Sequence, residues 1–366
     1  MKKGLVYIAD FSLPNMSAYA LHVLKMCDAF SELKYSVKLF LPYKEKTYNL
    51  NQIKKDFLLK KKFKIISFFN EKKILFFLRR IFFTFKIVNY LKKENVSKIY
   101  SRSIVPAVIL SFLNYNVILE LHTEMSGFTK FFFKLTNFLF FRKNLKIVVI
   151  NKKLIDLLKI RKIDYLVLDD AVDTRDFKIN KKNHFKNTCF YSGSFVQGKG
   201  VEIIKKLANK LPKFKFHLYG NIKTYDNYKS DTLPKNMVFK GFISYNELTK
   251  KIKKYKILLM PYQKKIGVLM RDTNVEDYFS PLKMFDYMAS GKTIIASDLK
   301  VYKHILKNGI NSILINPDKI DLWVKSIKKT SKSSKLNYLG KNAIRDVHNY
   351  SWNLRVRKIK KFYEKK

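Results

Sequence analysis

Cysteine is almost absent from this chain, which has only two in 366 residues. Cys27 and Cys189 lie far apart, which excludes a disulfide framework and the paired spacing of a zinc site, so we expect a reducing compartment. Long apolar runs are missing too. The nearest candidate for a membrane span, residues 104–119, is broken by Asn114 and Asn116 and predicts a short helix and a strand. No N-terminal signal is expected, because the first apolar run is short and leads directly into a loop.

Acidic residues are also scarce. Aspartate and glutamate number 28 against 75 lysines and arginines, which gives a formal net charge of +47, and only ten of the basic residues are arginine. One interpretation is attraction to an anionic surface, either nucleic acid or membrane headgroups. The other is a compositional drift toward Lys, Asn, Ile and Phe, and the sequence leaves both open. With 47% apolar and 15% aromatic residues, the chain is expected to fold.

Short β-like runs alternate with longer helical patterns along the whole chain, which predicts an α/β protein with doubly wound parallel sheets. Strands are expected at residues 4–9, 36–41, 64–67, 98–101, 116–121, 146–150, 165–168, 188–192, 215–219, 237–240, 257–260, 293–296 and 312–315. Helices are expected at residues 18–31, 71–93, 152–159, 201–209, 245–254, 282–289, 320–329 and 352–363.

The length suits two domains rather than one compact core. We expect a first domain at residues 1–168, a polar linker at 169–186 and a second domain at 187–350. A C-terminal helix at 351–366 is expected to pack back toward the first domain. Ligands of such sheets bind at the carboxyl ends of the strands.

The most informative segment is Ser280-Pro-Leu-Lys-Met-Phe-Asp-Tyr-Met-Ala-Ser-Gly-Lys-Thr293. Pro281 and Gly291 are the expected start and stop signals of a helix. The start of such a helix presents free backbone N–H groups and a positive dipole end, which suit a diphosphate. Lys283 in the first turn adds a positive charge, and Asp286 from the same helix can accept hydrogen bonds from sugar or ribose hydroxyls.

This segment resembles the donor-site signature of retaining glycosyltransferases of the GT-B fold, glycosyltransferase family 4 (glycosyl transferases group 1). The resemblance implies two Rossmann-like domains facing a central cleft, with the diphosphate of a nucleotide sugar held at Ser280, Pro281, Leu282 and Lys283. The family's pattern has two glutamates eight positions apart. Here the second is Asp286, and the first falls on the uncharged Tyr278.

The missing first carboxylate leaves the donor sugar without an assigned anchor, for which Asp272 and Asp277 are candidates. Asp286 would then bind ribose hydroxyls. The sequence names neither the sugar nor the base.

A glycine-bearing turn opens the second domain, in Tyr191-Ser-Gly-Ser-Phe-Val-Gln-Gly-Lys-Gly-Val-Glu. It is similar to the family segment in which an Arg and a Lys neutralise the diphosphate, which assigns Gly193 and Lys199 to that role. Ser194 stands where the arginine usually is, and Arg271 is our candidate for the missing charge. Lys199 is equally open to interpretation as a surface lysine.

No Asp-x-Asp occurs in the chain, so the metal-bridged phosphate site of the other large transferase fold is not expected. The prediction is a metal-independent enzyme with no cofactor other than a nucleotide diphosphate sugar as co-substrate. The strand edge that resembles the family's base-binding surface assigns Gly220, Phe242 and Ile243 to the nucleotide base.

Candidate acceptor-side residues lie in the first domain, where the resemblance is weaker. Glu120 and His122 end a strand and resemble the family's Glu-x-His corner, so His122 is predicted to act at the reacting sugar. Arg102 resembles the arginine of a Tyr-Thr-Arg motif and is expected to hold an anionic group or a backbone carbonyl. Ser17 is a plausible N-cap where the family commonly has a glycine pair.

Two segments of the first domain, residues 72–93 and 127–143, are rich in Phe with interleaved Lys and Arg. Helices there either lie in the headgroup layer of a membrane or bury their phenylalanines in the core. The prediction is a cytoplasmic protein, peripheral on the inner face of the cytoplasmic membrane, with no specific nucleic acid partner.

The predicted function is transfer of a hexose or similar sugar to a glycan or lipid-linked acceptor, in cell-surface polysaccharide or glycolipid synthesis, with His122, Lys199 and Asp286 as catalytic residues. Two other classes remain open. One is a catalytically inactive GT-B scaffold, motivated by Ser194 and Tyr278. The other is a binder of anionic surfaces or nucleic acid, against which the lack of zinc-finger spacing, RNP-like aromatics and clustered arginine argues.

Overall fold

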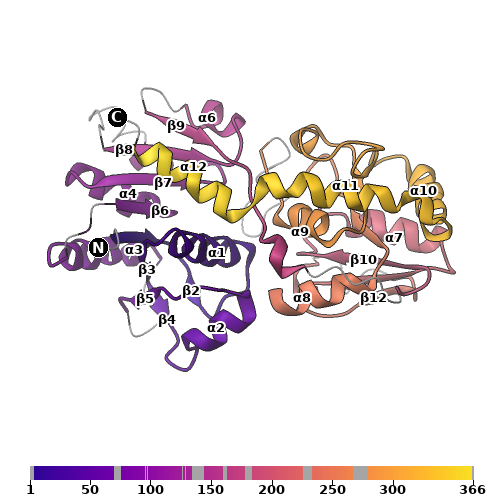
Figure 1. Ribbon diagram of the computed structural model, residues 1–366, viewed down its shortest axis with the longest axis horizontal. Helices are drawn as coiled ribbons and strands as arrows, with labels where there is room; N and C mark the ends of the chain where they lie inside the picture. Colours follow the sequence, from indigo (N-terminus) through magenta and orange to yellow (C-terminus); the bar gives the residue numbers. More distant parts are fainter. Residues whose placement is uncertain are drawn as a thin grey trace. The chain divides into compact units, whose positions relative to one another are not determined.

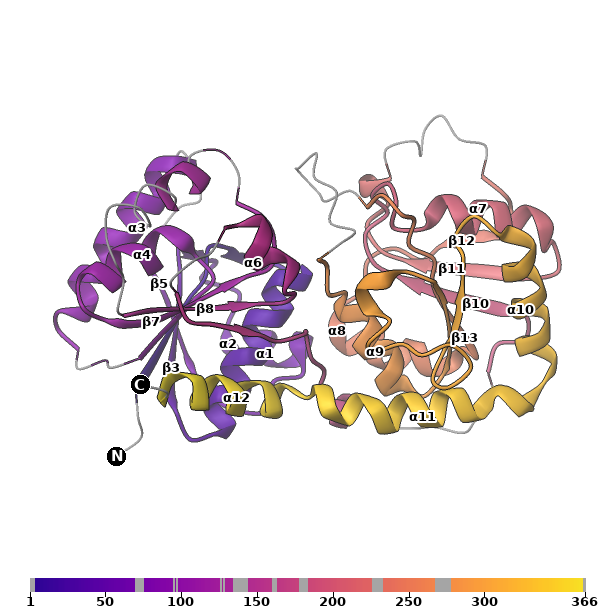
Figure 2. The same cartoon turned by 90° about the horizontal axis from the view of Figure 1, so that it is seen from above.

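The computed structural model describes residues 4–364 except 70–75, 95, 97, 126, 128, 134–143, 160–162, 178–183, 226–232 and 267–277. The chain forms two compact units (Figures 1 and 2). The first consists of Met1–Asp169 and Trp352–Lys366, and the second of Asp170–Ser351. The linker predicted at residues 169–186 stays a prediction.

The first unit contains a seven-stranded parallel sheet in the order β5-β3-β1-β6-β7-β8-β9. Its strands are β1 (Gly4–Ile8), β3 (Ser36–Leu41), β5 (Lys64–Ser67), β6 (Lys98–Ser101), β7 (Asn116–Leu121), β8 (Leu145–Val149) and β9 (Tyr165–Val167). The short strands β2 (Ser12–Leu13) and β4 (Tyr43–Lys44) pair separately.

The helices of this unit are α1 (Ala18–Glu32), α2 (Leu50–Phe57), α3 (Phe76–Leu91), α4 (Ile104–Phe112), α6 (Lys153–Leu157) and α12 (Trp352–Glu364). The last of these, from the end of the chain, packs beside α1, near its beginning (Figure 1).

The second unit contains a six-stranded parallel sheet in the order β12-β11-β10-β13-β14-β15. Its strands are β10 (Thr188–Ser192), β11 (Lys215–Tyr219), β12 (Met237–Phe239), β13 (Ile257–Met260), β14 (Thr293–Ser297) and β15 (Ile313–Ile315). Its α-helices are α7 (Val201–Lys210), α8 (Tyr245–Lys251), α9 (Leu282–Ser290), α10 (Ile320–Lys332) and α11 (Asn337–Val347).

Both sheets have the doubly wound strand order, in which the chain moves outward from one central strand and then restarts on its other side. The reversal falls between β1 and β6 in the first unit and between β10 and β13 in the second. A ligand site is expected outside the carboxyl ends of the two strands that flank such a reversal. The predicted α/β fold class is confirmed.

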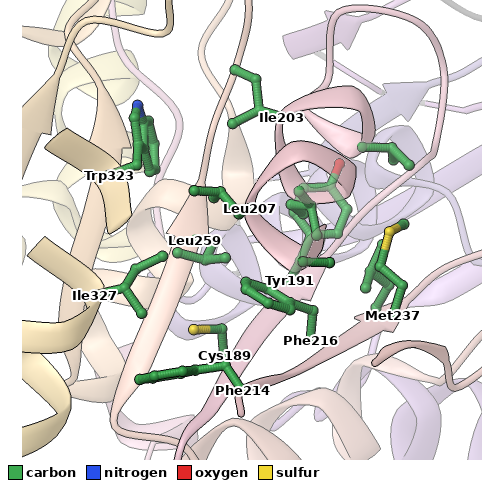
Figure 3. Packing of buried hydrophobic residues seen from close by; sticks show 14 of the residues in the cluster. Cys189, Tyr191, Ile203, Leu207, Phe214, Phe216, Met237, Leu259, Trp323 and Ile327 are labelled. Carbon is green, nitrogen blue, oxygen red and sulfur yellow. The ribbon is translucent and has the colours of Figure 1, made fainter. Parts of the chain in front are cut away.

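One face of the second sheet packs on α7 and α10 through a continuous apolar core (Figure 3). Trp323 and Ile327 of α10 and Ile203 and Leu207 of α7 are buried there with Cys189 of β10. Burial also raises the pKa of the Cys189 thiol, so this cysteine is a packing residue.

Helix α11 was not predicted. Its middle contains Gly340, which costs about 1 kcal/mol in a helix relative to alanine. A Cβ at Gly340 would lie 2.0 Å from the carbonyl oxygen of Gly291, which ends α9. Gly340 therefore allows α11 to pack closely against the end of α9. The local sequence does not indicate this contact.

None of the described helices is long and apolar enough to span a membrane.

Candidate active site

A glycine-bearing turn joins β10 to α7 at the strand reversal of the second sheet. A Cβ at Gly198 would lie 2.0 Å from the carbonyl oxygen of Lys265, and one at Gly200 would lie 2.4 Å from that of Pro261. The backbone N–H of Gln263 donates to the carbonyl of Gly198 at 2.8 Å. The two loops that follow β10 and β13 are thus held in direct backbone contact.

The predicted helix at residues 282–289 is confirmed as α9. Pro281 is its N-cap and offers no side-chain cap, and Gly291 ends it with φ of +68°. The Ser280 hydroxyl accepts a hydrogen bond from the backbone N–H of Asp170 at 3.1 Å. Because no side chain caps the first turn, starting at Leu282, its N–H groups remain suited to an anion.

Lys283 points back from α9 toward the glycine-bearing turn. Its Nζ is buried and lies 3.9 Å from the ring centre of Tyr191 and 5.1 Å from that of Tyr262. A Cβ at Gly193 would lie 2.7 Å from this Nζ, so the glycine leaves room for the ammonium group. No hydrogen-bond partner for Lys283 Nζ is found among the described residues.

Lys199 is the second cation at this place. Its Nζ donates to the hydroxyl of Ser194 at 3.0 Å. Ser194 is the residue that replaces the family's arginine. Burial lowers the pKa of Lys283 well below its ordinary value, and the nearby charge of Lys199 lowers it further. The pKa of Lys199 is lowered by burial as well.

Two partly desolvated amines near each other, with no described acidic group bonded to either, are suited to binding an anion. The sequence prediction had placed Gly193, Lys199 and Lys283 in one diphosphate site, and the structure brings these three together.

Asp286 lies one turn further along α9 and is buried. The Tyr245 hydroxyl of α8 donates to its Oδ1 at 3.0 Å. Burial and the neighbouring Asp286 raise the pKa of the Tyr245 hydroxyl, which keeps it a donor. The structure therefore fixes the orientation of Asp286; its predicted role toward ribose stays a prediction.

The residues assigned to the base lie at the ends of β11 and β12. Gly220 donates to the Gly241 carbonyl at 3.0 Å, and a Cβ on Gly220 would lie 2.1 Å from the Gly193 carbonyl oxygen. Phe242 is 56% exposed, and Ile243 is half-buried.

The remaining residues predicted on the donor side, Arg271, Asp272 and Asp277, lie outside the described residues. Tyr278, at the position of the missing glutamate, is buried.

The acceptor-side residues of the first unit follow its central strands. Ser17 caps α1 by accepting from the Ala20 N–H at 3.2 Å. The backbone of Arg102 donates to Ile8 at the end of β1, and its guanidinium stacks 4.7 Å from the ring centre of Tyr19. These residues therefore lie at the strand reversal of the first sheet.

Glu120, near the end of β7, is the centre of a buried polar cluster. Its carboxylate accepts from the Tyr100 hydroxyl at 2.7 Å, lies 2.7 Å from His122 Nε2 and pairs with Arg355 of α12. His22 of α1 lies 3.1 Å from the same carboxylate. Burial alone would raise the pKa of Glu120, but His22, Arg355 and His122 together hold it well below its usual range.

His22, Tyr100 and Arg355 were not predicted as site residues. Each lies in a different element. Tyr100 belongs to the Tyr-Ser-Arg segment that suggested Arg102, but no local motif marks His22 or Arg355, and only the fold brings the three to Glu120.

A metal ion was also considered, because ligand atoms of His22, Glu120 and His122 lie within 4.8 Å of one another. Arg355 already donates to Glu120 Oε1, the oxygen closest to both imidazoles. A guanidinium at that oxygen opposes a divalent cation, so these residues do not fit a metal site.

Part of the chain matches a known protein family. Residues 172–346 match the family model described as glycosyl transferases group 1. No curated protein is significantly similar to the chain in sequence.

Several solved structures share the fold at low identity. A glycosyltransferase from Rickettsia africae superposes with a TM-score of 0.74 at 14% identity, covering 99% of this chain and 98% of that one. Anabaena Alr3699/HepE, in complex with UDP and glucose, superposes with a TM-score of 0.72 at 13% identity, covering 98% of this chain and 99% of that one. WaaG, a glycosyltransferase involved in lipopolysaccharide biosynthesis, superposes with a TM-score of 0.66 at 12% identity, covering 97% of this chain and 99% of that one. The chain has the GT-B fold of these enzymes.

Proposed function

We propose that this chain, whose residues 172–346 match the family model of glycosyl transferases group 1, transfers a hexose with retention of configuration from a nucleotide diphosphate sugar. The acceptor is a glycan or a lipid-linked glycan of the cell surface. The observation that carries the proposal is the pair of partly desolvated lysines, Lys199 and Lys283, at the strand reversal of the second sheet.

The leaving group of this reaction is a nucleoside diphosphate, and its developing charge is the main feature that catalysis must stabilise. Lys199 and Lys283 neutralise that charge without a metal, and the uncapped N-terminus of α9 adds backbone N–H donors. Asp286, held by Tyr245, accepts hydrogen bonds from the ribose hydroxyls.

In the proposed step the bond between the anomeric carbon and the phosphate oxygen breaks while the acceptor hydroxyl attacks the same face. The hydroxyl proton passes to the departing diphosphate. His122 orients the reacting hydroxyls, and Glu120 fixes the His122 ring through the 2.7 Å contact to Nε2. Arg102 and Ser17 complete the acceptor side.

The donor site is tested by thermal shift with UDP, GDP, ADP and CMP. We expect one nucleotide, UDP by analogy with the Anabaena neighbour, to raise the melting temperature of the wild type and not that of Lys199→Ala. The shift should survive in Lys206→Ala, which removes an exposed lysine from α7. A folded wild-type protein that responds to none of the four would refute the transferase proposal.

We further propose that the protein binds the inner face of the cytoplasmic membrane through α3. Phe82 and Phe85 of this helix are 51% and 63% exposed, and Lys86 beside them is exposed too. Exposed aromatic rings next to a lysine suit insertion at an anionic headgroup layer. These two rings lie outside the core, which supports the membrane interpretation for this part of residues 72–93.

Vesicle flotation tests the proposed binding of α3 to a membrane. The wild type should float with vesicles that contain anionic phospholipid, and the double variant Phe82→Ser/Phe85→Ser should lose most of that binding. Leu322→Ser, which removes an exposed apolar side chain from α10, is the matched control and should bind normally. Equal flotation of the two variants would show that α3 is not the contact.

A further inference from the structure

Among the described residues, none bonded to Lys283 neutralises an ammonium charge. The described side chains next to its Nζ are the rings of Tyr191 and Tyr262 and the amine of Lys199. Burial raises the pKa of both tyrosine hydroxyls above the ordinary value, so neither ionises to provide a counterion. Cation–π contact compensates only part of the cost of removing the charge from water.

Two described carboxylates on the elements around Lys283, those of Glu202 and Asp286, have other partners. Glu202 at the start of α7 accepts from the Gly198 N–H at 3.3 Å and from Gln263 Nε2 at 2.9 Å. Asp286, on the same helix as Lys283, accepts from Tyr245. Among the described residues, therefore, nothing within hydrogen-bond reach of Lys283 carries a negative charge.

We propose that binding of the donor diphosphate is coupled to the uptake of a proton at Lys283. This inference rests on the proposed function and describes how its site responds to the ligand. In the empty site the neutral amine is the better tolerated form, because it is buried beside another cation. A diphosphate placed between the two lysines favours the ammonium form and provides the acceptor that its Nζ lacks.

The sign of the pH dependence follows from linkage. The pKa of Lys283 is lowered in the empty site and rises when the anion binds. Affinity is therefore constant below the empty-site pKa and falls as the pH rises from there toward the pKa of the complex. Within that window the dissociation constant increases by up to about tenfold per pH unit, and up to about one proton is taken up per site.

Isothermal titration calorimetry measures the proton directly. The probe is the tightest binder among UDP, GDP and ADP, titrated near pH 8.5 in buffers of different ionisation enthalpy. The terminal phosphate has a pKa of about 6, so the phosphate groups of the nucleotide exchange no proton at that pH. We expect the observed enthalpy to vary with buffer ionisation enthalpy with a slope that corresponds to proton uptake.

Lys283→Arg is the decisive variant, because arginine keeps the charge and does not titrate in this range. It should bind the nucleotide without proton uptake, whereas Lys199→Arg should retain the uptake. A wild-type slope of zero, or an equal slope in Lys283→Arg, would overturn the inference while leaving nucleotide binding intact.

A second measurement needs no variant. The wild-type dissociation constant should increase between pH 7 and pH 9, and a flat profile would overturn the inference even if Lys283→Arg does not fold. Failure of the wild type to bind any of the three nucleotides would overturn both this inference and the proposed function.

Discussion

Replacing Arg355 by alanine is expected to destabilise the first unit by about 3–5 kcal/mol, because it leaves a buried carboxylate without its guanidinium partner. Arg355 is 4% exposed and pairs with Glu120, which is 1% exposed. It also donates to the backbone carbonyls of Leu168 and Asp169. The variant therefore loses three contacts that hold α12 in place.

The two tryptophans of the chain allow the measurement to be assigned to one unit. Trp352 lies in the first unit against His22, with ring centres 5.0 Å apart, and Trp323 lies in the core of the second. In a Trp323→Phe background, denaturant unfolding followed by fluorescence reports the first unit. Arg357→Ala, at an exposed position of α12, should be nearly neutral.

A double variant separates the cost of the unpaired Glu120 charge from the loss of the other contacts of Arg355. Glu120→Gln combined with Arg355→Met removes both charges and should be more stable than Arg355→Ala alone. If Arg355→Ala unfolds at the same denaturant concentration as Arg357→Ala, the Glu120 cluster does not stabilise this unit.

Lys283→Met is expected to change stability and nucleotide binding in opposite directions. Removing a buried amine that lacks a hydrogen-bond partner should stabilise the nucleotide-free second unit by about 1 kcal/mol or more. The same change should weaken nucleotide binding about 100-fold, since truncating a buried charge that pairs with a ligand costs roughly 2–5 kcal/mol.

Trp323 fluorescence in a Trp352→Phe background reports the stability, and calorimetry reports the affinity. Lys206→Met is the matched control, because it removes a lysine at an exposed position and should change neither quantity strongly. A variant that is less stable than wild type and binds nucleotide normally would show that Lys283 is a packing residue rather than a diphosphate ligand.

Much of the fold could be predicted from local pattern. Apolar runs of strand length identified the parallel strands of both sheets, and Pro281 with Gly291 bounded α9 correctly. Helices α2 and α11 were missed for physical reasons. The first is only eight residues long and buries just Ile53 and Phe57, and the second carries a glycine whose purpose is contact with Gly291.

The candidate site, like the fold, could be predicted only in part from the sequence. Lys199 and Lys283 were proposed together from motif resemblance, and their proximity follows from the strand order around β10 and β13. The rings of Tyr191 and Tyr262 around Lys283 could not be inferred, because packing depends on which loops meet. Arg355 could not be assigned to Glu120, since the two are 235 residues apart in the chain.

The path of the chain has a consequence for synthesis. The first unit needs α12, which is translated after the whole second unit, whereas the second is one continuous segment, Asp170–Ser351. The ribosome therefore releases the complete second unit before the first has its guanidinium for Glu120. The usual N-terminus-first order of folding is reversed for the final step. Until α12 has been made, the N-terminal half carries Glu120 without the guanidinium that pairs with it in the folded unit.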